Sequence, residues 1–152
     1  MAKTRYGLIV EAGVPILPFA ASQVFKEKSG RFVAQSGGYM IAATNGINEI
    51  CGYVEFVGTT GSSNGDTKLP IDRSCEKVYE IPIYKTIAMT EADLRGYIGD
   101  TCDLYVASNI QYADLTNIAA DDILIIVGGD VAEQTLYVQI NANKLGQIKY
   151  ST

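Results

Sequence analysis

The stretch Leu136-Tyr137-Val138-Gln139-Ile140 decides the fold class of this chain, because its residues alternate with a period of two. The even positions are aliphatic, and the odd positions carry polar groups. Successive side chains of a β-strand point to opposite faces, so this alternation indicates a strand with one face in a core and the other outside. The closing part of the chain is therefore predicted to be β-structure.

Short strands separated by glycine-rich turns are predicted along most of the remaining chain. Residues 31–35 and 39–43 should form a hairpin around Ser36-Gly37-Gly38, and Asn45-Gly46 should form the next turn. Residues 123–127 are apolar on both faces, which predicts a central strand or one covered by a neighbouring subunit. The other predicted strands are short and rich in β-branched and aromatic residues, at positions 6–10, 50–57, 78–87 with a bend at Pro82, 101–106, 110–113 and 147–150.

One short helix is expected near residues 91–96. Thr90-Glu91-Ala92-Asp93 resembles a capping box, and Gly96 and Gly99 should end the helix after one or two turns. The chain has 152 residues, which is a length typical of one domain with a proper core. We therefore predict an all-β fold, mainly an antiparallel β-barrel or sandwich with this one helix.

Residues 1–25 are predicted to be an extended N-terminal arm, and residues 26–152 a single β-barrel or sandwich domain. Pro15 and Pro18 block a continuous helix in the arm and interrupt sheet pairing. Residues 58–70 are rich in glycine and serine, which predicts a long flexible loop. Such a loop is either a contact element or a solvated tip without a role.

The charge and hydropathy of the chain argue against two kinds of partner. The formal net charge is −5, so the long-range field repels phosphate backbones and no direct nucleic-acid partner is expected. Lys26, Lys28 and Arg31 could reverse this locally, but three cations around a glycine are typical of a solvated turn. A transmembrane helix needs about 20 nearly uncharged residues. The sequence has no such run, so no membrane partner is expected.

The chain contains no histidine. Histidine is the commonest metal ligand, and its ordinary pKa is the one nearest neutrality, so its absence removes most catalytic devices. Cys51, Cys75 and Cys102 lack the spacing of a metal-binding knuckle and are expected to be reduced thiols. Cys51 and Cys102 stand in apolar stretches and should be buried, whereas Cys75 should be more exposed.

No known catalytic motif fits the remaining candidates. Gly58, Gly61 and Gly65 are spaced somewhat like a phosphate-binding loop, but Asp66 follows where a lysine and a hydroxyl residue should stand. Asp121-Asp122 is interpreted as a polar turn, because neighbours on an extended chain point to opposite sides. We therefore expect no catalytic, cofactor-binding or metal-binding residues and no enzyme activity. A β-barrel enzyme, such as a nucleotide hydrolase that uses these carboxylates and a metal, is the alternative.

The ten tyrosines, beside four phenylalanines and no tryptophan, are the remaining unusual feature. Tyrosine combines apolar area with a hydroxyl and is enriched in protein interfaces. It is also a good strand residue, so a single tyrosine indicates little. As a group, the following tyrosines favour an interface: Tyr6, Tyr39, Tyr53, Tyr84, Tyr97, Tyr105, Tyr112 and Tyr137.

A series of strand-like features runs in a fixed order from Arg31 toward the end of the chain. It comprises the hairpin around Gly37-Gly38, Gly52-Tyr53-Val54-Glu55, Gly99-Asp100-Thr101-Cys102-Asp103-Leu104-Tyr105-Val106, Ile110-Gln111-Tyr112-Ala113-Asp114, Leu124-Ile125-Ile126-Val127-Gly128 and Leu136-Tyr137-Val138-Gln139-Ile140-Asn141. This order resembles that of the small decoration, or cement, proteins of tailed-bacteriophage heads.

The resemblance implies a non-enzymatic virion structural protein, made in the host bacterial cytoplasm and located on the capsid surface. Such a protein docks on the outside of the capsid and stabilises contacts between capsid subunits. Its partners would be the major capsid protein and copies of itself in a small homo-oligomer. No cofactor is implied.

In that setting the N-terminal arm is the expected docking element, because an extended segment can add a strand to the sheet edge of another chain. Its expected partner-contact residues are the apolar and aromatic ones: Tyr6, Ile9, Val14, Ile16, Leu17 and Phe19. The alternative function is a phage tail or head-fibre module that recognises a host glycan. Such a module would use exposed tyrosines and acids on loop tips.

Overall fold

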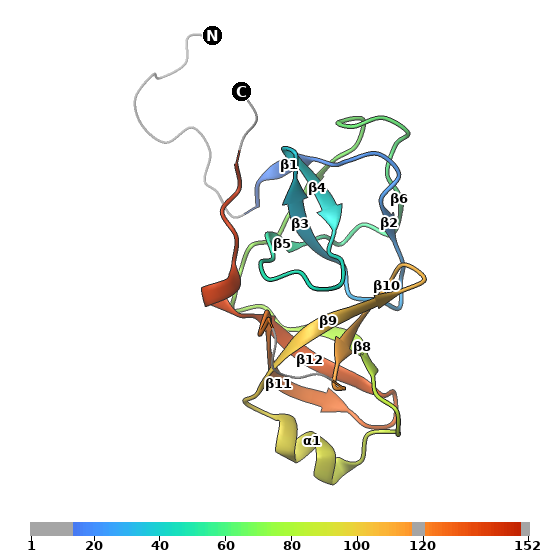
Figure 1. Cartoon of the computed structure of the whole chain (residues 1–152), viewed down its shortest axis with the longest axis vertical. Coiled ribbons are helices and arrows are strands. Elements are labelled where there is room, and N and C mark those ends of the chain that lie inside the picture. The colour runs from blue at the N-terminus through green and yellow to red at the C-terminus, as the bar shows by residue number, and fades with distance from the viewer. Residues whose placement is uncertain (1–13, 117–120, 150–152) are drawn as a thin grey trace.

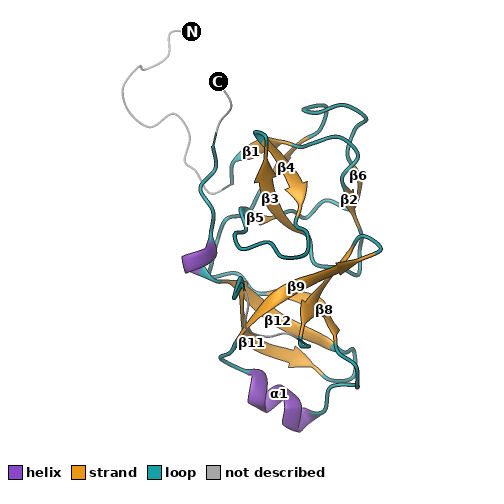
Figure 2. Ribbon diagram, in the orientation of Figure 1, coloured by secondary structure: helices purple, strands orange, loops and turns teal. Residues whose placement is uncertain are grey.

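The computed structural model describes residues 14–116 and 121–149 of the chain. These residues form two bodies that lie one above the other (Figure 1). The first body holds short strands from the N-terminal half, and the second is a β-barrel with one α-helix at its far end (Figure 2). The predicted all-β fold with one short helix is confirmed.

The barrel closes through five strands in the order β10-β8-β12-β11-β9. Every neighbouring pair is antiparallel except β8 with β10, which is parallel. Residues 79–82 of β8 pair with β12 and residues 83–84 pair with β10, so the bend predicted at Pro82 lies where the strand changes partner. The bounds are β8 Tyr79–Tyr84, β9 Thr101–Ala107, β10 Ile110–Asp114, β11 Leu124–Asp130 and β12 Thr135–Ile140.

Alternation along the barrel strands separates a buried inner face from an outer one. In β12 the aliphatic residues are buried, as the alternation predicts: Leu136, Val138 and Ile140. The apolar stretch 123–127 contributes to β11, which lies between β12 and β9. Leu124 and Ile126 are fully buried there, which confirms a central strand, whereas Val127 is exposed.

The helix α1 (Glu91–Tyr97) begins where the capping box predicts. The hydroxyl of Thr90 accepts from the backbone N–H of Asp93 at 3.2 Å, and the backbone N–H of Thr90 donates to the Asp93 carboxylate at 3.0 Å. These two bonds satisfy amide groups that a helix start leaves free. Leu94 and the preceding Met89 are buried in the barrel core, so α1 covers the far end of the barrel.

The first body contains three small sheets, with strand orders β4-β3-β5, β1-β7 and β2-β6. The predicted hairpin is confirmed as β3 and β4, and its turn has positive φ angles of 58° at Gly37 and 85° at Gly38. Glycine adopts this conformation without a steric penalty. The bounds are β1 Ile16–Pro18, β2 Val24–Phe25, β3 Phe32–Ser36, β4 Tyr39–Ala42, β5 Gly52–Tyr53, β6 Gly58–Thr59 and β7 Lys68–Pro70.

Three predicted segments differ from the structure. Residues 58–70 are not one loop, because β6 and β7 form their two ends. Within the stretch 50–57, only Gly52–Tyr53 lies in a strand, where it pairs with β3. Ile50 forms an isolated bridge to a different segment, at Leu145, so the strand does not extend to it. Residues 147–149 form no strand, and the strand predicted at 6–10 lies outside the described residues.

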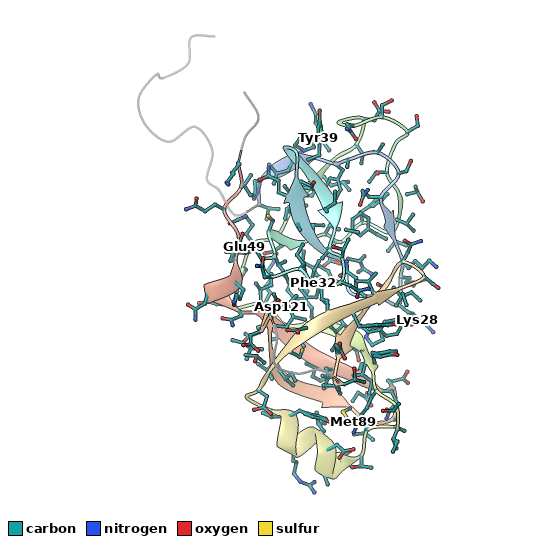
Figure 3. The ribbon with its side chains drawn as sticks, viewed as in Figure 1. Lys28, Phe32, Tyr39, Glu49, Met89 and Asp121 are labelled. Carbon is teal, nitrogen blue, oxygen red and sulfur yellow. The ribbon has the colours of Figure 1, made fainter. Side chains whose placement is uncertain are left out.

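Two hydrophobic cores hold the molecule together. The larger one fills the barrel and also takes in Phe32 and Tyr53 of the first body. The Tyr53 ring stacks on Tyr79 of β8, and the Phe32 ring lies edge-on to Tyr79. Phe32 lies where the two bodies meet (Figure 3). The smaller core lies within the first body and is built from Leu17, Phe19, Phe25, Val33, Met40, Cys51, Val54 and Ile71.

The N-terminal segment needs a correction. Residues 16–18 form β1 against β7, and residues 24–25 form β2 against β6, so this part of the predicted arm is built into the first body. Leu17 is 3% exposed and Phe19 is fully buried, with its ring edge-on to Phe25 at 5.8 Å. Both were expected to contact a partner, and that prediction is wrong because the smaller core of the chain itself buries them.

Candidate functional site

Three tyrosines from neighbouring barrel strands form a cluster that we call the tyrosine platform: Tyr84 of β8, Tyr105 of β9 and Tyr112 of β10. The rings of Tyr84 and Tyr105 are stacked, with centroids 3.9 Å apart and an angle of 16° between planes. The Tyr112 ring lies 6.2 Å from Tyr84 and 6.4 Å from Tyr105. Tyr84 is 39% exposed, so the platform presents aromatic surface to solvent.

Strand register explains why these rings meet. Tyr105 and Tyr112 are direct partners in the β9–β10 ladder. Gln111 and Ala113, on either side of Tyr112, are buried, so Tyr112 lies on the opposite, outer face. The parallel pairing of β8 with β10 then brings Tyr84 alongside this pair. A cross-strand aromatic pair also stabilises the sheet itself, by roughly 0.2–1 kcal/mol.

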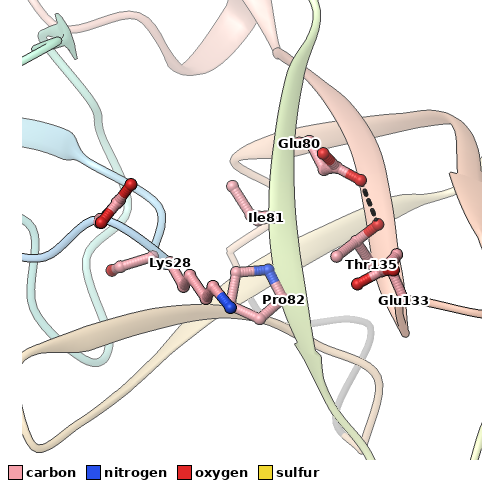
Figure 4. A pocket seen from close by; sticks show the side chains of 8 residues that line it. Lys28, Glu80, Ile81, Pro82, Glu133 and Thr135 are labelled. Atoms are coloured by element: carbon pink, nitrogen blue, oxygen red, sulfur yellow. Dashed lines mark hydrogen bonds between the residues drawn. The ribbon is translucent and has the colours of Figure 1, made fainter.

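A cavity of about 360 Å³, which we call the acidic groove, adjoins β8, the strand that also carries Tyr84. Its lining comes from the segment before β3, from β8, from the turn before β12 and from the first residue of β12: Glu27, Lys28, Ser29, Glu80, Ile81, Pro82, Glu133 and Thr135. Figure 4 shows the hydroxyl of Thr135 donating to the Glu80 carboxylate, at 2.7 Å. This bond orients Glu80 without neutralising its charge.

Acids outnumber bases in the groove. The lining includes three acids, Glu27, Glu80 and Glu133, and one base, Lys28. Within residues 14–116 and 121–149, none of these four side chains takes part in an ion pair. The groove therefore carries excess negative charge that favours a cationic partner.

The groove and the platform share β8. Glu80, Pro82 and Tyr84 alternate along the strand, and Pro82 is the direct partner of Thr135 in β12. A strand rises about 3.3 Å per residue, so Glu80 and Tyr84 are separated by roughly 13 Å along it. One outer face of the barrel thus has the Glu80 carboxylate toward one end and the tyrosine platform, with Tyr84 exposed, toward the other.

The platform is suited to contact and poorly suited to proton transfer. A hydrogen bond with Tyr105 raises the pKa of Tyr84 above the ordinary value of a tyrosine, and repulsion between the two tyrosines in their ionised forms raises it further. Tyr84 therefore stays neutral at physiological pH. A neutral tyrosine supplies apolar area, one hydrogen-bond donor and an acceptor.

The segment that carries Asp121 and Asp122 is held in place by hydrogen bonds. Asp103 is 6% exposed, and one of its oxygens accepts from the backbone N–H groups of Asp121 and Asp122, at 3.0 and 2.7 Å. Asp122 in turn accepts from the hydroxyl of Thr101 at 2.7 Å. These bonds fix the chain just before β11, in agreement with a polar turn. In the described part of the chain, no three acid, cysteine or histidine side chains gather to hold a metal ion.

The three cysteines are free thiols, as predicted. Cys51 and Cys102 are buried, and Cys75 is half-buried, which also agrees with the sequence. Desolvation raises the pKa of each thiol above its ordinary range. Only the thiolate is a good nucleophile or metal ligand, so these residues are poor candidates for either role.

The other residues expected to contact a partner fall into two groups. Val14 is 45% exposed and Ile16 is 68% exposed, so both are accessible to a partner. Tyr6 and Ile9 lie outside the described residues. The contact prediction therefore stays open for these four.

The sequence indicates the three platform tyrosines as interface candidates, but it does not show that they lie together. Alternation places Tyr105 and Tyr112 on outer faces, yet their pairing depends on the register of β9 with β10. The acidic groove was missed altogether. Glu27, Glu80 and Glu133 are far apart in sequence, and each alone has the ordinary pattern of a solvated acid.

Within the described ranges, no helix is long and apolar enough to cross a membrane. In comparisons with protein-family models, curated proteins and solved structures, the chain matches none of them.

Proposed function

We propose that this chain is a non-enzymatic virion structural protein that docks on the outside of a phage capsid and stabilises contacts between capsid subunits. The observation that carries the proposal is the tyrosine platform. It places three tyrosines on one outer face of the barrel, and Tyr84 is 39% exposed there. Tyrosine is enriched where proteins meet, because a rigid ring buries much area at a small entropic cost.

The barrel is a suitable scaffold for such a role. Closed strands leave no free edge that would pair with copies of the chain in an uncontrolled way. A specific interface should bury at least about 1,000 Å² in total, which is more than the platform alone offers. The exposed side chains of Val14 and Ile16 would add apolar area if the N-terminal segment also contacts the capsid.

The proposed partners are the major capsid protein and further copies of this chain in a small homo-oligomer around a local symmetry axis. An enzymatic role has less support. The carboxylate of Asp103 holds backbone amides, and burial raises the pKa of every thiol.

Co-sedimentation with expanded, undecorated heads of the phage that encodes the chain tests this function. We expect the purified protein to pellet with the heads and to raise the temperature at which they disrupt. Heads that leave the protein in the supernatant and disrupt at an unchanged temperature would contradict the proposal.

A glycan-binding module of a phage tail or head fibre is the second candidate. Exposed tyrosine rings can stack on sugar rings, and Asp114, the register partner of Tyr84, could accept hydrogen bonds from sugar hydroxyls. A glycan-array signal that Tyr84→Ala abolishes, with no binding to heads, would favour this candidate.

A further inference from the structure

We infer that the tyrosine platform and the acidic groove together bind a basic, arginine-containing segment of the protein on which the chain docks. This inference rests on the proposed function and names the chemistry of its partner. One arginine of the segment stacks on Tyr84, and a second basic residue of the same segment enters the acidic groove.

Charge complementarity selects a cationic partner. The carboxylates of Glu27, Glu80 and Glu133 line one cavity and make no ion pair within the described residues. Lys28 is the sole base of the lining, so the groove keeps an excess of acid. The formal net charge of the whole chain is −5, which adds a long-range attraction for a basic segment.

The aromatic rings favour arginine in particular. A guanidinium group is planar and weakly hydrated, and it stacks on tyrosine faces within about 6 Å of the ring centroid. The chain already uses the arginine contact elsewhere, since the Arg31 guanidinium carbon lies 5.5 Å from the Tyr53 centroid. An ammonium group also lies over a tyrosine, since Lys85 Nζ is 5.4 Å from the Tyr97 centroid. Among described residues, no cation occupies such a position over the platform tyrosines, so that place is free for a partner.

The spacing along β8 sets the pattern of the segment. Glu80 and Tyr84 are four residues apart on the same strand face, or roughly 13 Å. An extended segment with two basic residues four positions apart has the same separation and presents both side chains on one face. The site therefore recognises an extended segment with this spacing.

The direct test uses three fluorescein-labelled peptides of glycine and serine with two charged residues four positions apart. The charged pair is arginine, lysine or glutamate. Fluorescence anisotropy with the full chain should show the tightest binding for arginine and none for glutamate. The affinity for the arginine peptide should fall as salt rises, because salt screens exposed charges. Equal binding of all three peptides, or of none, would overturn the inference.

Variants with matched controls assign the binding to this surface. Tyr84→Ala should lower the affinity for the arginine peptide about two- to fivefold, whereas Tyr84→Phe keeps the ring and should leave this affinity nearly unchanged. The double variant Glu80→Gln, Glu133→Gln should weaken binding and flatten its salt dependence. Tyr39→Ala and Glu49→Gln are the controls, since both residues lie on the first body, away from Lys28 (Figure 3). Equal losses in controls and site variants would contradict a defined site.

Binding of the wild-type chain and the site variants to phage heads distinguishes a failure of this inference from a failure of the docking function. If the wild-type chain binds heads and the site variants bind them equally well, the inference fails and the docking function stands. If the wild-type chain binds the arginine peptide but no heads, the site stands and the docking function fails. Binding to a glycan array that Tyr84→Ala abolishes, without binding to the arginine peptide, would overturn the inference in favour of a sugar.

Discussion

The side-chain amide of Gln111 pairs with both backbone groups of Phe32, as a neighbouring strand would. Its oxygen accepts from the Phe32 N–H at 2.9 Å, and its NH₂ group donates to the Phe32 carbonyl at 2.9 Å. The two residues are 79 positions apart and belong to different bodies. Gln111 is 3% exposed, so this pairing satisfies buried polar groups that have no access to water.

Gln111→Ala should therefore destabilise the whole chain. The substitution leaves the Phe32 N–H buried without its partner, while the Phe32 carbonyl keeps a bond from the Ala43 N–H, so the cost should be about 1–3 kcal/mol. Urea unfolding followed by circular dichroism measures this loss. Gln139→Ala is the control, because Gln139 donates to the Glu76 carbonyl at an exposed position and should cost about 0.5 kcal/mol or less. Equal costs for the two substitutions would show that Gln111 does not join the bodies.

Two glycines should respond to alanine in opposite directions. A Cβ atom on Gly52 would lie 2.5 Å from the backbone oxygen of Asp72, so Gly52→Ala should destabilise by about 2 kcal/mol or more. A Cβ atom on Gly96 meets nothing within 4 Å, and Gly96 lies inside α1. Gly96→Ala should stabilise by about 0.5–1 kcal/mol, because alanine is the better helix former. Thermal unfolding of both variants checks the pair, and a change of the same sign in both would contradict the backbone geometry.

Asp93 should titrate at an unusually low pH. A hydrogen bond from Lys85 at 2.8 Å, followed by one from the Thr90 backbone, lowers the pKa of this carboxyl to about 2. A lowered folded-state pKa stabilises the fold above the unfolded-state value of about 4, and this contribution is lost as pH falls toward 2. Carbon-detected NMR of the Asp93 carboxyl should show its midpoint near 2, and Lys85→Met should move it upward. An unchanged midpoint in that variant would rule out Lys85 as the main cause.

The cysteines should react in a fixed order with a thiol reagent such as Ellman's reagent. Cys75 is half-buried and should react first, although more slowly than a free thiol because desolvation raises its pKa. Cys51 and Cys102 are buried and should react only as the chain unfolds. Cys75→Ser should abolish the first phase and leave the slow phase unchanged. A fast phase that persists in Cys75→Ser would contradict the burial of the other two thiols.

The sequence predicted the elements well because their signals are local. The alternation in Leu136-Tyr137-Val138-Gln139-Ile140, the Gly37-Gly38 turn and the Thr90 capping box each depend on residues within a few positions. Barrel closure depends on distant pairings instead. The parallel contact of β8 with β10 joins residues about 30 positions apart in sequence, and no local pattern specifies it.

The partner-contact residues were predicted less well, for a physical reason. Leu17 and Phe19 have the apolar chemistry of interface anchors, but the same chemistry buries them against Phe25 and Met40 in the smaller core. Composition cannot distinguish burial within a chain from burial between chains. The tyrosines show the same ambiguity, since Tyr53 is buried at 4% exposure while Tyr84 is 39% exposed.

Electron cryomicroscopy of expanded heads mixed with this chain tests the central claim most directly. The account predicts extra density on the outer capsid surface at fixed lattice positions, with the barrel face that carries Tyr84 turned toward a capsid subunit. Heads whose outer surface is unchanged at saturating protein would contradict it.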